Sequence, residues 1–207
     1  MYIVNKKLVR LLEQWREETL PKVVDNWEEL SDETKENMKC VNDLYCGKHV
    51  VLNLQEYAGS ALSDWEVVEA DGAKLGREKH LLWNRGKESA TLLAVRTVCE
   101  AFGPDANAQA GAPIEFSDSL DRIGEKSRLI AYRGNRFNVP FENSAAVYFH
   151  NHKGHISNAH QSLPPTKQKN QLIRSVIYDL QDKIIIDGIR AMGIINCHIT
   201  KPLMFKC

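Results

Sequence analysis

Apolar residues recur at helical spacing along much of the chain. The clearest set near the N-terminus is Val4, Leu8, Leu11 and Trp15. Spacings of four, three and four positions place these residues on one face of a helix, which Pro21 is expected to end. The same period predicts helices over residues 50–68 and 172–180. Repeated amphipathic helices predict a mainly α fold.

Residues that favour helix ends divide the remaining sequence into further helices. Ser31 and Ser89 are good N-caps and Pro140 suits a first helical turn, so a helix is predicted at each of them. Gly103 and Gly193 are expected to end helices, because glycine adopts the backbone conformation that follows a last turn. Strand signals are few. The strongest are Tyr45 with Val50-Val51, and Leu129–Tyr132.

Composition places the chain among ordinary globular proteins. Hydrophobic residues make up 43% and charged residues 26%, which allows a buried core. The five Cys form no small-domain disulfide framework, and Lys6 and Lys7 interrupt the apolar start where a signal peptide would lie. No apolar run approaches the length that crosses a membrane. An intracellular protein is therefore expected.

Charge is spread unevenly, although the formal net charge is zero. Residues 128–207 carry 11 Lys and Arg against 4 Asp and Glu, a net charge of +7, together with five of the seven His. A basic last third is typical of a surface that faces phosphates. It also fits a solvated face that docks on the acidic front of the same chain, and the sequence leaves both interpretations open.

Three arginines in the basic region are candidates for nucleic-acid contact. Arg128, Arg133 and Arg136 are interleaved with Tyr132 and Phe137. Basic groups beside aromatic rings can bind phosphates and stack on bases. Arginine stems also pack on aromatic rings inside ordinary helical proteins. The residue pattern alone does not separate these two hypotheses.

Metal-binding residue types occur in two places. Cys46 and His49 form a Cys-x-x-His pair, which supplies half of a tetrahedral zinc site. A small zinc protein would need two further Cys or His, and a lone Cys otherwise packs as a small hydrophobic side chain. The second place is the group His150, His152, His155 and His160. These can ligate a metal or lie at helix ends and on the surface, and we expect no metal and no cofactor.

No catalytic arrangement is recognisable in the sequence. Two-metal nuclease chemistry needs about three converging carboxylates, whereas the Asp and Glu residues here fall mostly on predicted solvent faces of helices. No Gly-rich phosphate loop and no Gly-x-Ser-x-Gly motif occurs. The chain is therefore not expected to be an enzyme.

Two phrases of the sequence resemble hAT-superfamily transposases. The first, Asp43-Leu-Tyr-Cys-Gly-Lys-His-Val-Val-Leu-Asn-Leu54, is similar to the family's Cys-x-x-His block followed by Leu-Asn, at Cys46, His49 and Asn53. The second, Arg133-Gly-Asn-Arg-Phe-Asn138, resembles the insertion of hAT-like proteins of animal genomes. Residues 172–203 look like the later part of that insertion.

The resemblance implies a partial RNase H-like core remnant over residues 1–70, followed by an all-α insertion over residues 71–207. The family's catalytic Asp, Asp and Glu match no residue of this sequence, so a truncated or domesticated transposase without catalysis is implied. The insertion of such enzymes lies near the active site and can contact DNA. DNA, a full-length relative and a nuclear location are therefore expected, with Cys46, His49, Arg133 and Arg136 near the nucleic acid.

A helical protein–protein interaction module, unrelated to transposition, is the alternative. The first predicted helix begins almost at residue 1 without a capping residue, as if the chain began inside a larger fold. An incomplete fold leaves apolar surface that a protein partner would cover.

Overall fold

The computed structural model describes residues 2–39, 47–80, 88–133 and 138–205. Every regular element among these residues is a helix, which confirms the mainly α prediction. None of the described helices is both long and apolar enough to cross a membrane. Contacts divide the chain into two units, Met1–Tyr45 and Cys46–Cys207.

The first unit is a helical hairpin. Helix α1 (Tyr2–Val23) packs against α2 (Asp32–Lys39), and the short 3₁₀ turn η1 (Trp27–Glu29) lies between them in the chain. The Oγ of Ser31 accepts a hydrogen bond from the Thr34 N–H at 3.2 Å, so Ser31 caps α2 as predicted. Pro21 lies inside α1 rather than at its end. Pro21 has no N–H to donate to the preceding turn, and α1 ends two residues later at Val23.

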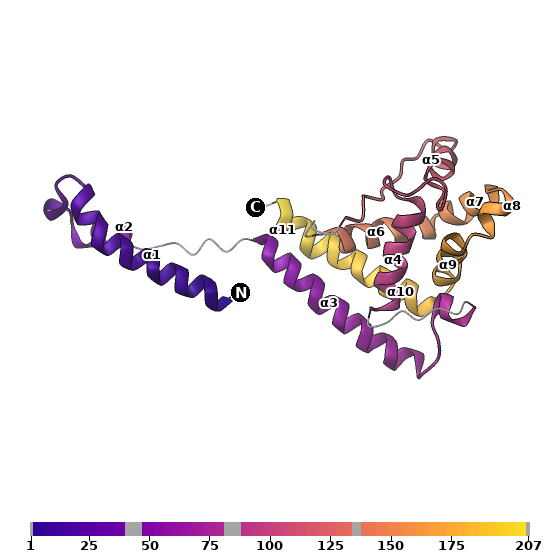
Figure 1. Cartoon of the computed structure of the whole chain (residues 1–207), viewed down its shortest axis with the longest axis horizontal. Coiled ribbons are helices and arrows are strands. Elements are labelled where there is room, and N and C mark those ends of the chain that lie inside the picture. Colours follow the sequence, from indigo (N-terminus) through magenta and orange to yellow (C-terminus); the bar gives the residue numbers. More distant parts are fainter. Residues whose placement is uncertain (1, 40–46, 81–87, 134–137, 206–207) are drawn as a thin grey trace. The chain divides into compact units, whose positions relative to one another are not determined.

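The second unit holds the remaining helices. In chain order they are α3 (Gly47–Ala70), η2 (Gly76–Lys79), α4 (Ala90–Phe102), α5 (Pro113–Asp121), α6 (Val139–His152), α7 (His155–Ser162), α8 (Pro165–Gln168), α9 (Gln171–Leu180), α10 (Lys183–Ile195), the π-helical turn η3 (Asn196–Thr200) and α11 (Lys201–Phe205). Helix α10 packs on α6 and on α4, and α4 also packs on α9 (Figure 1). These four helices, together with α5 and α7, contribute the buried residues of the main hydrophobic core.

Helix α3 runs beside α10 and forms a smaller second core with α6 and α10. The buried members are Val51, Leu62, Phe141 and Met192. The helix expected over residues 50–68 is confirmed, so Val51 is helical rather than in a strand, and Tyr45 lies outside the described residues. The boundary expected at residue 70 stays a prediction: α3 ends at Ala70 and packs within the second unit, which begins at Cys46.

Gly193 does not end a helix, which corrects the prediction from sequence. Helix α10 continues through it into η3 and α11. A Cβ at Gly193 would lie 3.2 Å from the Cα of Ala145 on α6 and 3.4 Å from its nitrogen. The missing side chain therefore allows α10 and α6 to cross closely, which is a tertiary reason for glycine that the spacing of apolar residues does not show.

The run Leu129–Tyr132 has no regular secondary structure and is not part of a strand. The main-chain N–H of Arg128 donates to Nε2 of His150 at 3.0 Å, and the N–H of Ile130 donates to Oδ1 of Asn143 at 2.9 Å. Both acceptors are side chains of α6. These side chains accept the hydrogen bonds that a neighbouring strand would otherwise accept, because main-chain N–H groups near a core need acceptors.

Candidate functional site

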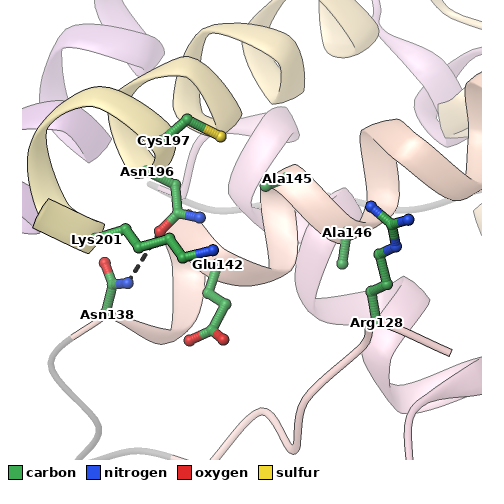
Figure 2. Close-up of a pocket in the computed structure, with 8 residues that line it drawn as sticks. All are labelled: Arg128, Asn138, Glu142, Ala145, Ala146, Asn196, Cys197 and Lys201. Atoms are coloured by element: carbon green, nitrogen blue, oxygen red, sulfur yellow. Dashed lines mark hydrogen bonds between the residues drawn. The ribbon is translucent and has the colours of Figure 1, made fainter. Parts of the chain in front are cut away.

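An open pocket of about 350 Å³ lies between α6 and the continuous helix made by α10, η3 and α11. We name it the α6–α11 pocket. Its lining residues, drawn in Figure 2, are Arg128, Asn138, Glu142, Ala145, Ala146, Asn196, Cys197 and Lys201. Ala145 is also the residue that Gly193 approaches, so the close helix crossing positions one wall of the pocket.

Two amide side chains join the walls of the pocket. Nδ2 of Asn138 donates to Oδ1 of Asn196 at 2.9 Å, and Oγ1 of Thr200 donates to the same oxygen at 3.1 Å. Asn196 and Thr200 both belong to the π-helical turn η3. Such turns recur at functional sites, because the widened turn shifts side chains from their usual helical directions. Here the shift brings Asn196 against the first turn of α6.

The charged residues of the pocket are Arg128, Lys201 and Glu142, all of them exposed. Figure 2 shows Arg128 beside Ala146 at one end, with Lys201 and Glu142 at the other. Among the described residues, no carboxylate forms an ion pair with either cation. The two cations therefore outweigh the single carboxylate, and the pocket favours anions.

Arg128 is held in place at both its side chain and its main chain. The guanidinium carbon lies 3.4 Å from the centroid of the Phe149 ring, a cation–π contact. The main-chain N–H donates to Nε2 of His150. Stacking on a ring leaves the edge of the guanidinium fork free to donate to a ligand, so Arg128 is oriented rather than neutralised.

His150 is fully buried, and its ring accepts the hydrogen bond that holds the main chain of Arg128. Because Nε2 accepts a hydrogen bond, a neutral ring carries its proton on Nδ1, which lies 3.0 Å from Nδ1 of His155. Burial lowers the pKa of His150 to about 4, and His155 and Arg128 act in the same direction. His150 is therefore neutral at pH 7 and serves as a positioning group.

The described residues contain no group of three or more His, Cys, Asp and Glu that could hold a metal. His150 and His155 contact each other, whereas His152 stacks on Tyr148 with ring centroids 6.0 Å apart. Cys46 lies outside the described residues, and the side chain of His49 is not described. The Cys-x-x-His motif therefore stays a prediction.

Those residues predicted from sequence that the structure describes do not lie at one site. Arg128 lines the pocket, but Arg133 is exposed elsewhere and places Nε 2.7 Å from Oδ2 of Asp105. Arg136 lies outside the described residues, and Asn53 is exposed on α3. Of the two described arginines among these candidates, Arg128 lines the α6–α11 pocket and Arg133 does not.

Sequence reasoning did not single out four residues of this pocket as contact candidates: Asn138, Asn196, Cys197 and Lys201. Asn138 and Asn196 are separated by 58 positions, so no local pattern links them. Asn138 precedes a helix start and was predicted only as part of a phrase. A π-helical turn has no recognised sequence signal, and without it Asn196 and Lys201 are ordinary polar residues near the end of a helix.

Comparison of the chain with protein-family models, curated proteins and solved structures gives no match. The pocket must therefore be interpreted from its own residues. Its two cations, the hydrogen-bonded amides and the open shape suit an extended polyanion better than a small enclosed ligand.

Proposed function

We propose that this chain is a non-catalytic binding protein derived from a hAT-like transposase, and that its α6–α11 pocket contacts DNA phosphates. In this proposal residues 1–70 descend from the RNase H-like core and residues 71–207 from the helical insertion. The protein then acts in the nucleus, on DNA or together with a full-length relative. The resemblance to hAT-like transposases supports the proposed origin. The positive charge of the pocket supports the proposed contact with DNA phosphates.

The observation that supports DNA binding is a pair of exposed cations, Arg128 and Lys201, on one pocket. A guanidinium offers a fork of donors to phosphate oxygens, and an ammonium offers a mobile point charge. Glu142 lies beside Lys201 and disfavours a phosphate at that end (Figure 2). We therefore expect Arg128 to contribute more than Lys201.

The double substitution Arg128→Ala/Lys201→Ala is expected to weaken binding to duplex DNA by about 10-fold or more at low salt. Each phosphate contact contributes about 0.9 to the slope of log K against log salt, so the slope should fall by about 1.8. Fluorescence anisotropy with a labelled duplex, repeated at several salt concentrations, measures both quantities.

A matched control and an opposite variant sharpen this test. Lys74→Ala/Arg122→Ala removes two exposed cations that lie outside the pocket and should leave the affinity nearly unchanged. Glu142→Gln removes the carboxylate and should strengthen binding. Absence of any binding by the unmodified chain at low salt would reject the proposal, because phosphate contacts are strongest there.

A protein-interaction module remains the second candidate, and the first unit favours it. Helix α1 exposes Leu11, Leu12 and Trp15, at 54%, 40% and 59% of their surface. Apolar side chains grouped in this way are usually covered by a partner. The expected occupant is a second copy or a relative that shares the same helix.

Light scattering during gel filtration tests this second candidate. The unmodified chain is expected to increase in mass as its concentration rises, and Leu11→Gln/Trp15→Gln should keep it monomeric. Gln14→Ala/Glu17→Ala changes exposed polar positions of the same helix and should not alter the mass. A monomer at all concentrations, for the unmodified chain, argues against self-association.

A further inference from the structure

A second pocket, of about 310 Å³, lies where α7, α8 and α9 meet. We name it the α8–α9 pocket. Its polar lining residues are His160, Gln168, Lys169, Arg174 and Tyr178. No Asp or Glu of the described residues lines it. It therefore differs from the α6–α11 pocket, in which one carboxylate stands among the cations.

An aromatic platform adjoins this pocket. The ring of Tyr178 stacks on the ring of His80, with centroids 4.2 Å apart and an interplanar angle of 23°. His80 follows η2 and is exposed, so the pair offers a ring face to solvent. Tyr178 is fixed by its hydroxyl, which accepts a hydrogen bond from the guanidinium of Arg174 at 3.1 Å. A flat ligand could extend the stack beyond His80.

Two cations stand beside the platform at the start of α9. Lys169 and Arg174 are exposed and form no ion pair with a described carboxylate. Between them, Oδ1 of Asn170 accepts the Leu172 N–H at 2.8 Å and caps the helix. The helix N-terminus adds partial positive charge at the same place. The pocket thus combines an anion-binding rim with a stacking surface.

The acidic residues nearest in the chain do not cancel this charge. Asp179 and Asp182 are buried, and their carboxylates accept hydrogen bonds from Arg77 and Lys79 respectively. Burial lowers the pKa of His160, so His160 is neutral at pH 7 and offers hydrogen bonding rather than charge.

We propose that the α8–α9 pocket binds single-stranded nucleic acid, with a base stacked on the His80–Tyr178 platform and its phosphate held by Lys169 and Arg174. Every base has a π-face, so little sequence preference is expected. A duplex keeps its bases stacked inside and cannot use the platform. This inference rests on the proposed function and deepens it, because it names the kind of strand that a second site selects.

The experiment uses the whole chain and a deoxythymidine oligonucleotide of roughly 12 nucleotides, within the usual site sizes for single-strand binding. One position carries 2-aminopurine, whose fluorescence falls when it stacks. Binding by the unmodified chain should quench this probe. His80→Ala should abolish most of the quenching and weaken single-strand binding by about 10-fold, while duplex binding stays unchanged.

Two further variants separate stacking from charge. Tyr178→Phe keeps the ring but removes the hydroxyl that anchors Arg174, so quenching should persist. Lys169→Gln/Arg174→Gln should weaken single-strand binding and flatten its salt dependence. Circular dichroism shows whether each variant is folded.

The outcomes distinguish this inference from the proposed function. Duplex binding that depends on Arg128, without quenching of the single-stranded probe, would overturn the inference and leave the proposed function standing. Single-strand binding that ignores His80 but requires Arg128 and Lys201 would also overturn it. A phosphopeptide that binds as tightly as the oligonucleotide through Lys169 and Arg174 would assign the pocket to phosphate alone and contradict the stacking step.

Discussion

Asp179→Ala is expected to lower the free energy of unfolding of the second unit by about 3–5 kcal/mol, because it removes the carboxylate that pairs with the buried Arg77 guanidinium. Asp179 is 2% exposed and Arg77 is 4% exposed. Oδ1 of Asp179 accepts the main-chain N–H of Arg77 at 2.8 Å, and Oδ2 accepts Nε at 2.9 Å. A terminal guanidinium nitrogen of Arg77 also donates to Oδ2.

The pair ties three parts of the fold together. Arg77 lies in η2, Asp179 lies on α9, and a third guanidinium bond reaches Oγ1 of Thr97 on α4 at 2.8 Å. Gly76 makes this arrangement possible, because its φ of 47° is unfavourable for other residues and a Cβ there would collide with Asp179. Loss of the carboxylate therefore removes a link between η2 and the bundle as well as the ion pair.

Urea unfolding followed by far-UV circular dichroism measures this effect. The double variant Arg77→Met/Asp179→Leu removes both charges and should recover much of the lost stability, since apolar replacement of a buried pair is often neutral or better. Asp187→Ala removes one member of the exposed Lys183–Asp187 pair and should change stability little. A small effect of Asp179→Ala would show that the buried charge is relieved by water or rearrangement.

The sequence was sufficient to predict a helix end where the capping contacts involve only residues close to that end in the chain. Ser89 and Gly103 bound α4 as predicted: Oγ of Ser89 accepts the Leu92 N–H at 3.1 Å, and the Gly103 N–H donates to the carbonyl of Cys99 at 2.8 Å. These bonds join residues three or four positions apart, so the sequence contains the whole motif. Helix α4 was predictable for that reason.

Tertiary contacts explain what the sequence could not show. Gly193 has the residue type of a helix end, but its role depends on Ala145, which lies on another helix. The α6–α11 pocket likewise depends on Asn196, whose partner Asn138 is remote in the chain. Arg128 was found because it belongs to a run of arginines interleaved with aromatic residues. Its companion Lys201 has the same type but lacked any neighbouring signal.

Helix α3 shows how a hydrophobic pattern can mislead about which side chains are inside. Val67 and Val68 are 59% and 74% exposed, whereas Glu66 between Trp65 and Val67 is fully buried. The apolar residues predicted the helix correctly, but an acidic residue occupies an inner position. A buried carboxylate is stable only where hydrogen-bond donors satisfy it, so Glu66 must have such donors as neighbours.

Glu66→Ala is expected to lower the free energy of unfolding by about 2–4 kcal/mol, because it leaves buried N–H donors without partners. One carboxylate oxygen accepts the N–H of Ala90 at 2.7 Å, and the other accepts the N–H of Thr91 at 2.8 Å. These donors belong to the first turn of α4, which cannot satisfy them internally. Glu66 thus caps α4 from a neighbouring helix, and its negative charge also suits the helix dipole.

The same urea titration tests the cap, with Glu69→Ala as the matched control, since Glu69 is exposed one turn further along α3. Glu66→Gln should lower stability by an amount between those of Glu66→Ala and Glu69→Ala. Its amide keeps one acceptor oxygen, but its NH₂ group then faces a main-chain N–H of α4. Ser89→Ala removes only the local cap and should cost about 1 kcal/mol. If Glu66→Ala costs no more than Ser89→Ala, the carboxylate is not a main link between α3 and α4. A larger cost shows that a residue read as surface charge holds the two helices together.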